Sequence, residues 1–152
     1  MNEPITSPAL NALYQDILLE HHQDPRNFGE MVRPDRQAEG YNPLCGDRVC
    51  IQLKIDPQKP GKIAQIKFKG EGCSICMASA SMMTEEVAGH EMSEITASIS
   101  NFRQMMQGQK DGSVFEGDLR SLEGVKRFPV RIKCALLPWM TLKDALEGKQ
   151  NG

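Results

Sequence analysis

Residues 70–83, GEGCSICMASASMM, decide the fold, because they join a predicted strand to a predicted helix. The preceding residues 62–69 alternate apolar and polar side chains, which is typical of a half-buried strand. Small and unbranched side chains then continue to Gly89, which predicts a helix that ends there. Cys73 and Cys76 therefore lie where a strand passes through glycines into a helix N-terminus. Unpaired backbone N–H groups and the helix dipole favour the thiolate at such a place.

A second strand is predicted at residues 49–55, which alternate in the same way. The proline- and glycine-containing stretch 57–61 turns this strand into residues 62–69, so the two form an antiparallel hairpin. A further short strand is expected at 38–41. In a hairpin, the beginning of the first strand lies beside the end of the second. The turn NPLCGD at residues 42–47 is therefore expected beside the start of the helix.

The N-terminal helix is predicted over residues 8–22, with Thr6 or Ser7 as its cap. It ends on two adjacent histidines, His21 and His22. Adjacent helix positions point about 100° apart and do not easily share one metal ion. We therefore expect both imidazoles to be solvated at an ordinary helix end.

Three helical segments are predicted in the second half of the chain. Residues 93–107 carry an apolar stripe with helical spacing, and residues 119–125 form a shorter segment. Pro129 begins the last helix, and Cys134 lies about one turn further on, so a third thiol is near a helix N-terminus. Pro138 lies inside this helix, where the missing backbone donor predicts a kink or an interruption.

The composition is that of one globular domain, which we expect to span residues 1–152 with an ordered core at about 8–147. A net charge of −2 gives no reason to expect nucleic acid or a membrane surface as a partner. No apolar run approaches the roughly 20 residues of a membrane helix. The N-terminus also lacks the segments of a signal peptide, so a cytoplasmic location is expected. Five cysteines in a reducing compartment indicate metal or redox chemistry rather than disulfides.

The candidate ligands are Cys45, Asp47, Cys73 and Cys134. Three thiols and a carboxylate from three separate segments favour a tetrahedral zinc site. Two alternatives stay open on the residues alone. Cys73 and Cys76 have the spacing of a dithiol redox pair, although that motif normally lies in a parallel β-α-β unit. In the second alternative, the cysteines are incidental or buried side chains with no metal or redox role.

Three motifs resemble those of the IscU/NifU-like iron–sulfur cluster assembly proteins. They are NP-x-CGD at residues 42–47, G-x-GCSI-x-x-ASASMM at 70–83 and FP-x-R-x-KCA-x-x-x-W at 128–139. Within this family the chain looks like the SufU branch. A segment around 117–125 is inserted before the last cysteine, and Lys133 stands where scaffold-type members carry a histidine.

The resemblance implies an α+β fold of the SufE/NifU-like kind, in which helices pack on one face of a small antiparallel sheet. It implies one zinc ion held by Cys45, Asp47, Cys73 and Cys134, with Arg131 in a supporting role. The implied function is that of a zinc-dependent sulfur acceptor. Cys45 would accept persulfide sulfur from a SufS-like, pyridoxal-phosphate (PLP)-dependent cysteine desulfurase, for downstream cluster-assembly proteins. The alternative is a scaffold on which a [2Fe–2S] iron–sulfur cluster is assembled on the same thiolates.

Cys76 departs from the resemblance, because this branch more often has a serine at that position. The additional thiol could compete with Asp47 for a metal, since zinc accepts sulfur readily. We expect Cys76 to be turned toward the core of the protein, so that Asp47 keeps its place.

Overall fold

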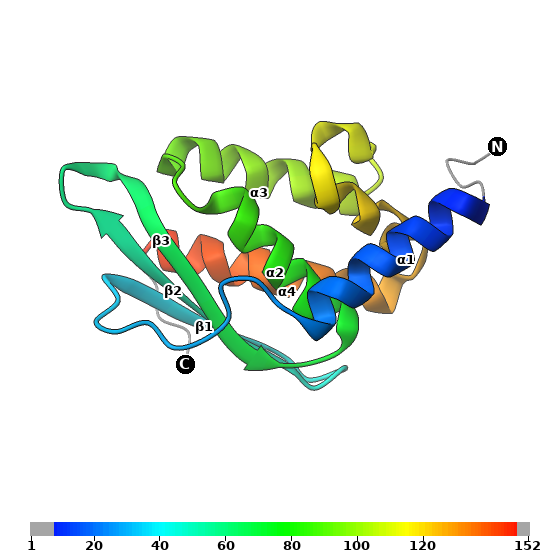
Figure 1. Ribbon diagram of the computed structural model, residues 1–152, viewed down its shortest axis with the longest axis horizontal. Coiled ribbons are helices and arrows are strands. Elements are labelled where there is room, and N and C mark those ends of the chain that lie inside the picture. Colours follow the sequence, from blue (N-terminus) through cyan, green and yellow to red (C-terminus); the bar gives the residue numbers. More distant parts are fainter. Residues whose placement is uncertain (1–7, 149–152) are drawn as a thin grey trace.

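Three strands form one antiparallel sheet in the order β1-β2-β3 in the computed structural model, which describes residues 8–148 (Figure 1). They are β1 Arg36–Asn42, β2 Asp47–Asp56 and β3 Lys59–Glu71. The predicted hairpin of β2 and β3 is confirmed, and its turn is confined to residues 57–58. The two longer strands extend beyond the predicted ones because backbone pairing continues past the last alternating apolar residues.

The register brings one end of each strand to the same place. Asn42 at the end of β1 pairs with Asp47, and Arg48 pairs with Glu71 at the end of β3. The beginning of β2 therefore lies between the ends of its two neighbours. This arrangement confirms that the turn at residues 42–47 lies beside the glycine-rich start of the next helix.

The helices lie on one side of the sheet, which confirms the predicted α+β fold (Figure 1). The α-helices are α1 Pro8–Gln23, α2 Ser74–Val87, α3 Met92–Met106 and α4 Pro129–Leu146, and the 3-10 segments are η1 Gly112–Val114 and η2 Gly117–Arg127. α4 contacts β1 and β2, α2 contacts β3, and α1 packs against α2. No helix among residues 8–148 is both long and apolar enough to cross a bilayer.

α2 and α4 are joined by hydrogen bonds in the core. The Trp139 indole Nε1–H donates to Ser79 Oγ at 3.1 Å, and the Ser79 hydroxyl donates to the Ala135 carbonyl at 2.7 Å. The Trp139 ring is fully buried and stacks on Phe102 of α3, with ring centroids 4.5 Å apart. These contacts hold the N-terminal ends of α2 and α4, which carry Cys73 and Cys134, in a constant relation to each other.

Gly40 lets α4 approach the sheet closely. A Cβ at this position of β1 would lie 2.1 Å from Thr141 Oγ1 and 3.0 Å from the Leu137 side chain. A larger residue would therefore force the Thr141 and Leu137 side chains, or α4 itself, to shift.

His21 is buried, so the prediction of a solvated imidazole was wrong for this residue. It is 0% exposed, with Nδ1 at 2.7 Å from Ser81 Oγ and Nε2 at 2.7 Å from Asp118 Oδ2. α1 packs between α2 and η2, which brings these distant polar groups to the imidazole. His22 points to solvent, as predicted.

The interruption predicted at Pro138 is not found. α4 continues as a helix through Pro138. This proline is buried, as are Ala135 and Trp139 on the same helix. The proline removes one backbone hydrogen bond, whereas burial of the surrounding apolar side chains stabilises the helix as a whole. The caps predicted at Thr6 and Ser7 lie outside the described residues.

Candidate metal centre

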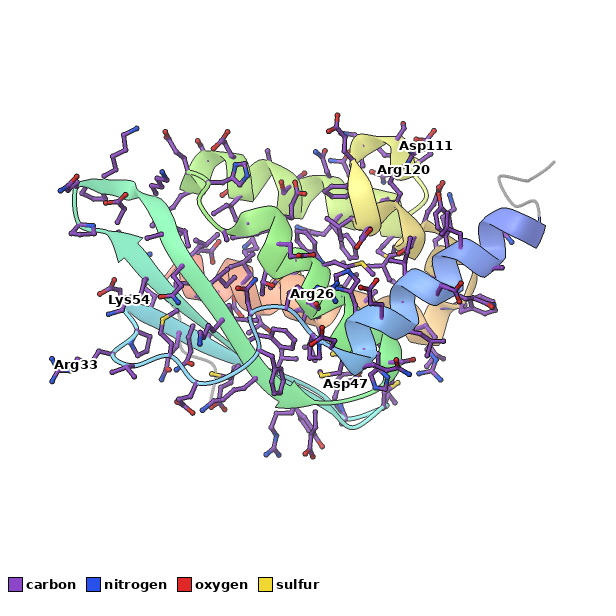
Figure 2. The ribbon with its side chains drawn as sticks, viewed as in Figure 1. Arg26, Arg33, Asp47, Lys54, Asp111 and Arg120 are labelled. Carbon is purple, nitrogen blue, oxygen red and sulfur yellow. The ribbon has the colours of Figure 1, made fainter. Side chains whose placement is uncertain are left out.

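Cys45, Asp47 and Cys134 bring their ligand atoms within 4.8 Å of one another. Cys45 lies in the turn between β1 and β2, Asp47 begins β2, and Cys134 lies in the second turn of α4. The Cys134 and Cys45 sulfurs are 3.1 Å apart. Figure 2 places Asp47 at the end of the sheet where β3 passes toward α2. Asp47 and Cys134 are fully buried, whereas Cys45 is half-buried.

Cys73 lies beside this group at the N-terminus of α2, where it is the N-cap residue, but its sulfur is not among the atoms within 4.8 Å of one another. Its backbone N–H donates to Asp47 Oδ1 at 2.9 Å, and its side chain is half-buried. Gly72 makes this approach feasible, because a Cβ there would lie 2.5 Å from Asp47 Oδ1. The glycine-rich stretch thus places the Cys73 backbone beside the carboxylate, at the position that the sequence predicts.

Burial raises the pKa of the Cys134 thiol, and hydrogen bonds to Cys45, Asp47 and Cys73 raise it further. Without a cation, this thiol is therefore protonated at neutral pH. A divalent ion bound among these atoms would reverse that preference, because metal binding to a thiol displaces its proton. The closely spaced sulfurs and carboxylate thus fit a thiophilic cation such as zinc.

Cys76 lies in α2 with its side chain fully buried, turned into the core as expected. Burial raises the pKa of its thiol, and the negative charges of Asp47, Cys73 and Cys45 raise it further. Like Cys73, it is not a member of the group formed by Cys45, Asp47 and Cys134. Cys73, however, hydrogen-bonds to Cys134 and Arg131. The turned-in position of Cys76 therefore favours a core role over a role as a ligand.

Arg131 is exposed and lies one turn before Cys134 on α4. The charge of Cys73 raises the pKa of the Arg131 guanidinium, and hydrogen bonds to Cys134 and Cys73 add to this effect. The side chain is thus positioned to balance the negative charge of the thiolates. A cavity of about 320 Å³ opens beside Arg131, between α1, η2 and the start of α4.

Three exposed apolar side chains lie close to the candidate ligands along the chain. They are Leu44, next to Cys45, at 68% exposure, and Phe128 and Val130 at 60% and 59% at the start of α4. Exposed apolar groups around a site of this kind are typical of a surface that another protein covers.

The structure also brings together His21, Glu85 and Asp118, whose ligand atoms lie within 4.8 Å of one another. The His21 Nε2 is already hydrogen-bonded to Asp118, so this nitrogen has a partner without a metal ion. A single sequence offers no signal for this group, because its members are up to 97 residues apart. Sequence reasoning likewise treats Asn42 only as the first residue of the turn, although its amide contacts Asp47 and Cys134.

The fold and the site define a class: an α+β domain whose three-stranded sheet and two helix N-termini converge on a thiol-rich centre. This chain belongs to the family of NifU-like N-terminal domains, which matches residues 13–135. The resemblance drawn from the motifs is thereby confirmed.

Two relatives are similar along most of their length. The chain is 40% identical to the zinc-dependent sulfurtransferase SufU of Bacillus subtilis, over 94% of this chain and 95% of that protein. It is 38% identical to the iron–sulfur cluster assembly scaffold protein IscU of Streptococcus pyogenes, over 93% of this chain and 87% of that protein.

A solved structure supports the same assignment. A protein from Fervidobacterium islandicum AW-1, described as a candidate iron–sulfur cluster assembly scaffold for the SUF system, superposes with a TM-score of 0.80. It is 33% identical, and the match covers 90% of this chain and 98% of that one.

Proposed function

We propose that this chain is a zinc-dependent sulfur acceptor for iron–sulfur cluster assembly. The observation that carries this proposal is the group of Cys45, Asp47 and Cys134, whose ligand atoms lie within 4.8 Å of one another. Within this group only Cys45 is partly exposed, so a fixed pair of ligands accompanies one accessible sulfur. The similarity to a relative named as a zinc-dependent sulfurtransferase supports the same function.

Cys45, Asp47, Cys73 and Cys134 would hold the zinc ion. Three thiolates and a carboxylate complete a tetrahedral set, and they carry more negative charge than the ion neutralises. When bound, zinc would supply the positive charge that keeps the thiols deprotonated near neutral pH. The Arg131 guanidinium would offset part of the remaining negative charge.

Cys45 would accept sulfur from the persulfide of a SufS-like, PLP-dependent cysteine desulfurase. Its thiolate attacks the outer sulfur of that persulfide, and a new S–S bond forms on Cys45. The S–S bond to the desulfurase cysteine breaks, and that cysteine leaves as a thiolate. The persulfide proton stays on the transferred sulfur, so no oxidant or reductant is consumed. The sulfur then passes to downstream cluster-assembly proteins.

The surface around Cys45 suits this exchange. Leu44, Phe128 and Val130 expose apolar side chains that a docked desulfurase would cover and so exclude water from the reacting sulfurs. All five cysteines are unpaired thiols, which suits a reducing compartment, and we place the activity in the cytoplasm.

A second candidate is a scaffold on which a [2Fe–2S] cluster is assembled. It is supported by the similarity to a relative named as an IscU scaffold protein. The exposed Lys133 and the inserted η2 segment favour sulfur transfer. Scaffold-type members of the family that the motifs resemble carry a histidine at the position of Lys133 and lack the insertion.

Three measurements distinguish the two candidates: metal analysis, the absorption spectrum of protein purified without air, and the turnover of a cysteine desulfurase with and without this protein. We expect a colourless protein with one zinc ion per chain that stimulates a cysteine desulfurase. A brown protein with iron and sulfide, and no stimulation, would support the scaffold function instead.

A further inference from the structure

Asn42 is a buried residue at the end of β1, and its side chain contacts three parts of the centre. Its Oδ1 accepts the Leu44 backbone N–H at 3.3 Å. Its Nδ2 donates to Asp47 Oδ2 at 3.2 Å and lies 3.7 Å from Cys134 Sγ. One amide thus joins the turn that carries Cys45 to two candidate ligands on other elements.

The partners of this amide determine which way it points. Leu44 offers only an N–H on this side, so it requires the carbonyl oxygen of the amide. Asp47 and Cys134 offer a carboxylate oxygen and a sulfur, so they require the NH₂ group. Because both ends of the amide have matching partners, its orientation follows from chemistry as well as from geometry.

Both oxygens of the Asp47 carboxylate are held by donors from neighbouring elements. Oδ1 accepts the Cys73 backbone N–H at 2.9 Å, and Oδ2 accepts the Asn42 amide. Groups that hydrogen-bond to a metal ligand orient it, and their loss typically weakens metal binding about 10–100-fold. The carboxylate of Asp47 is therefore oriented before any metal binds.

The Asn42 amide contacts only one of two neighbouring thiols directly. It approaches Cys134, which is fully buried, and influences Cys45 only through the Leu44 backbone. A buried side chain with a fixed hydrogen-bond partner keeps its position, whereas a half-buried side chain in a turn is free to move. The contact therefore favours Cys134 as a permanent ligand and leaves Cys45, 3.1 Å away, as the sulfur that exchanges.

We propose that Asn42 is a positioning residue that holds Asp47 and Cys134 as fixed metal ligands and leaves Cys45 as the thiol that exchanges. This inference rests on the proposed function, since it assumes a metal held by these residues. It assigns Asn42 no contact with the sulfur that is transferred.

Two variants separate the contacts of this amide. Asn42→Asp keeps the acceptor for the Leu44 N–H and the side-chain shape, but it removes the donor and adds a charge. Asn42→Ser keeps a hydroxyl acceptor for the turn without adding charge, but it is too short to reach Asp47 or Cys134. The matched control is Gln52→Glu, which changes another buried amide on the same sheet to an acid. Gln52 accepts the Met31 backbone N–H and belongs to no candidate metal group.

Zinc affinity is measured in the full chain by competition with a chromophoric chelator, and the ligand geometry is measured from the absorption bands of the Co²⁺-substituted protein. We expect both Asn42 variants to bind zinc about 10–100-fold more weakly, with shifted cobalt bands. Gln52→Glu should match the wild type within about twofold and keep the wild-type bands. In the zinc-loaded wild type, alkylation followed by mass spectrometry should modify Cys45 well before Cys134, and this difference should narrow in Asn42→Ser.

Wild-type zinc affinity and cobalt bands in both Asn42 variants would overturn the inference. It would also fail if only Asn42→Asp lost affinity, since repulsion from the new charge would then explain the loss. An equal loss of zinc affinity in Gln52→Glu would also overturn it, because general destabilisation of the protein would then explain the loss in the Asn42 variants. A wild-type protein without a sulfur-to-cobalt charge-transfer band would instead refute the proposed function itself, so the two failures are distinguishable.

Discussion

The His21 imidazole lies with Nε2 2.7 Å from Asp118 Oδ2, and this contact ties α1 to η2 across 97 residues of sequence. On its other side, Nδ1 lies 2.7 Å from Ser81 Oγ of α2, and Ser81 Oγ also accepts the Arg26 backbone N–H. Both ring nitrogens are thus paired in a fully buried side chain. Because η2 lines the cavity beside Arg131, the same contact supports one wall of the region around the candidate centre.

His21→Ala is expected to lower the free energy of unfolding by about 2–3 kcal/mol, because it leaves buried polar partners unsatisfied. The measurement is urea unfolding followed by circular dichroism. His22→Ala is the matched control, since the neighbouring imidazole is exposed and its loss should change stability by less than about 0.5 kcal/mol. Equal effects of the two substitutions would contradict the structural role of His21.

Zinc removal should destabilise the protein without unfolding it. The centre joins the turn after β1, the start of β2 and α4, so a bound ion ties segments that are distant in sequence. The core around Trp139 and Phe102 does not depend on these ligands. A loss of about 3 kcal/mol would lower the melting temperature by about 6–12 °C for a chain of this size. Thermal melts with and without a strong chelator test this, and an unchanged midpoint would show that no ion links these segments.

Cys45→Ala should abolish the stimulation of a cognate cysteine desulfurase while the fold survives, because Cys45 lies half-exposed in a turn. Desulfurase turnover with a persulfide-reducing assay is the measurement. Cys50→Ala serves as the control, since Cys50 lies within β2, outside the candidate metal group, and its loss should leave stimulation unchanged. Stimulation that persists in Cys45→Ala would move the acceptor role to another thiol, with Cys76 as the next candidate.

Cys76→Ala should keep one zinc ion per chain, because the Cys76 side chain is fully buried and turned into the core of the protein. Asp47→Ala should weaken zinc binding more strongly, since it removes a carboxylate that is oriented by Cys73 and Asn42. Metal content after dialysis against a weak chelator compares the two variants. The reverse order, with zinc lost from Cys76→Ala and kept in Asp47→Ala, would indicate a site formed by sulfur alone.

Much of the fold and of the centre was predictable because the relevant signals are local. Alternation along residues 49–55 and 62–69 predicts two strands, and a short turn between them leaves only a hairpin. Hairpin geometry then places Cys45 and Asp47 near Cys73 without further information. The small side chains after Cys73 similarly predict α2, which neighbouring elements can approach closely.

The sequence alone thus determined the strands and the α-helices and suggested the candidate ligands, since period, turn residues and motif spacing are properties of neighbouring residues. Only the tertiary structure decided that His21 is buried, that α4 runs unbroken through Pro138, and that Asn42 faces Asp47 and Cys134. Each of these outcomes depends on which surfaces of distant elements come together. A histidine at a helix end is solvated or buried according to what packs over it, and here α2 and η2 supply Ser81 and Asp118 from 60 and 97 residues away.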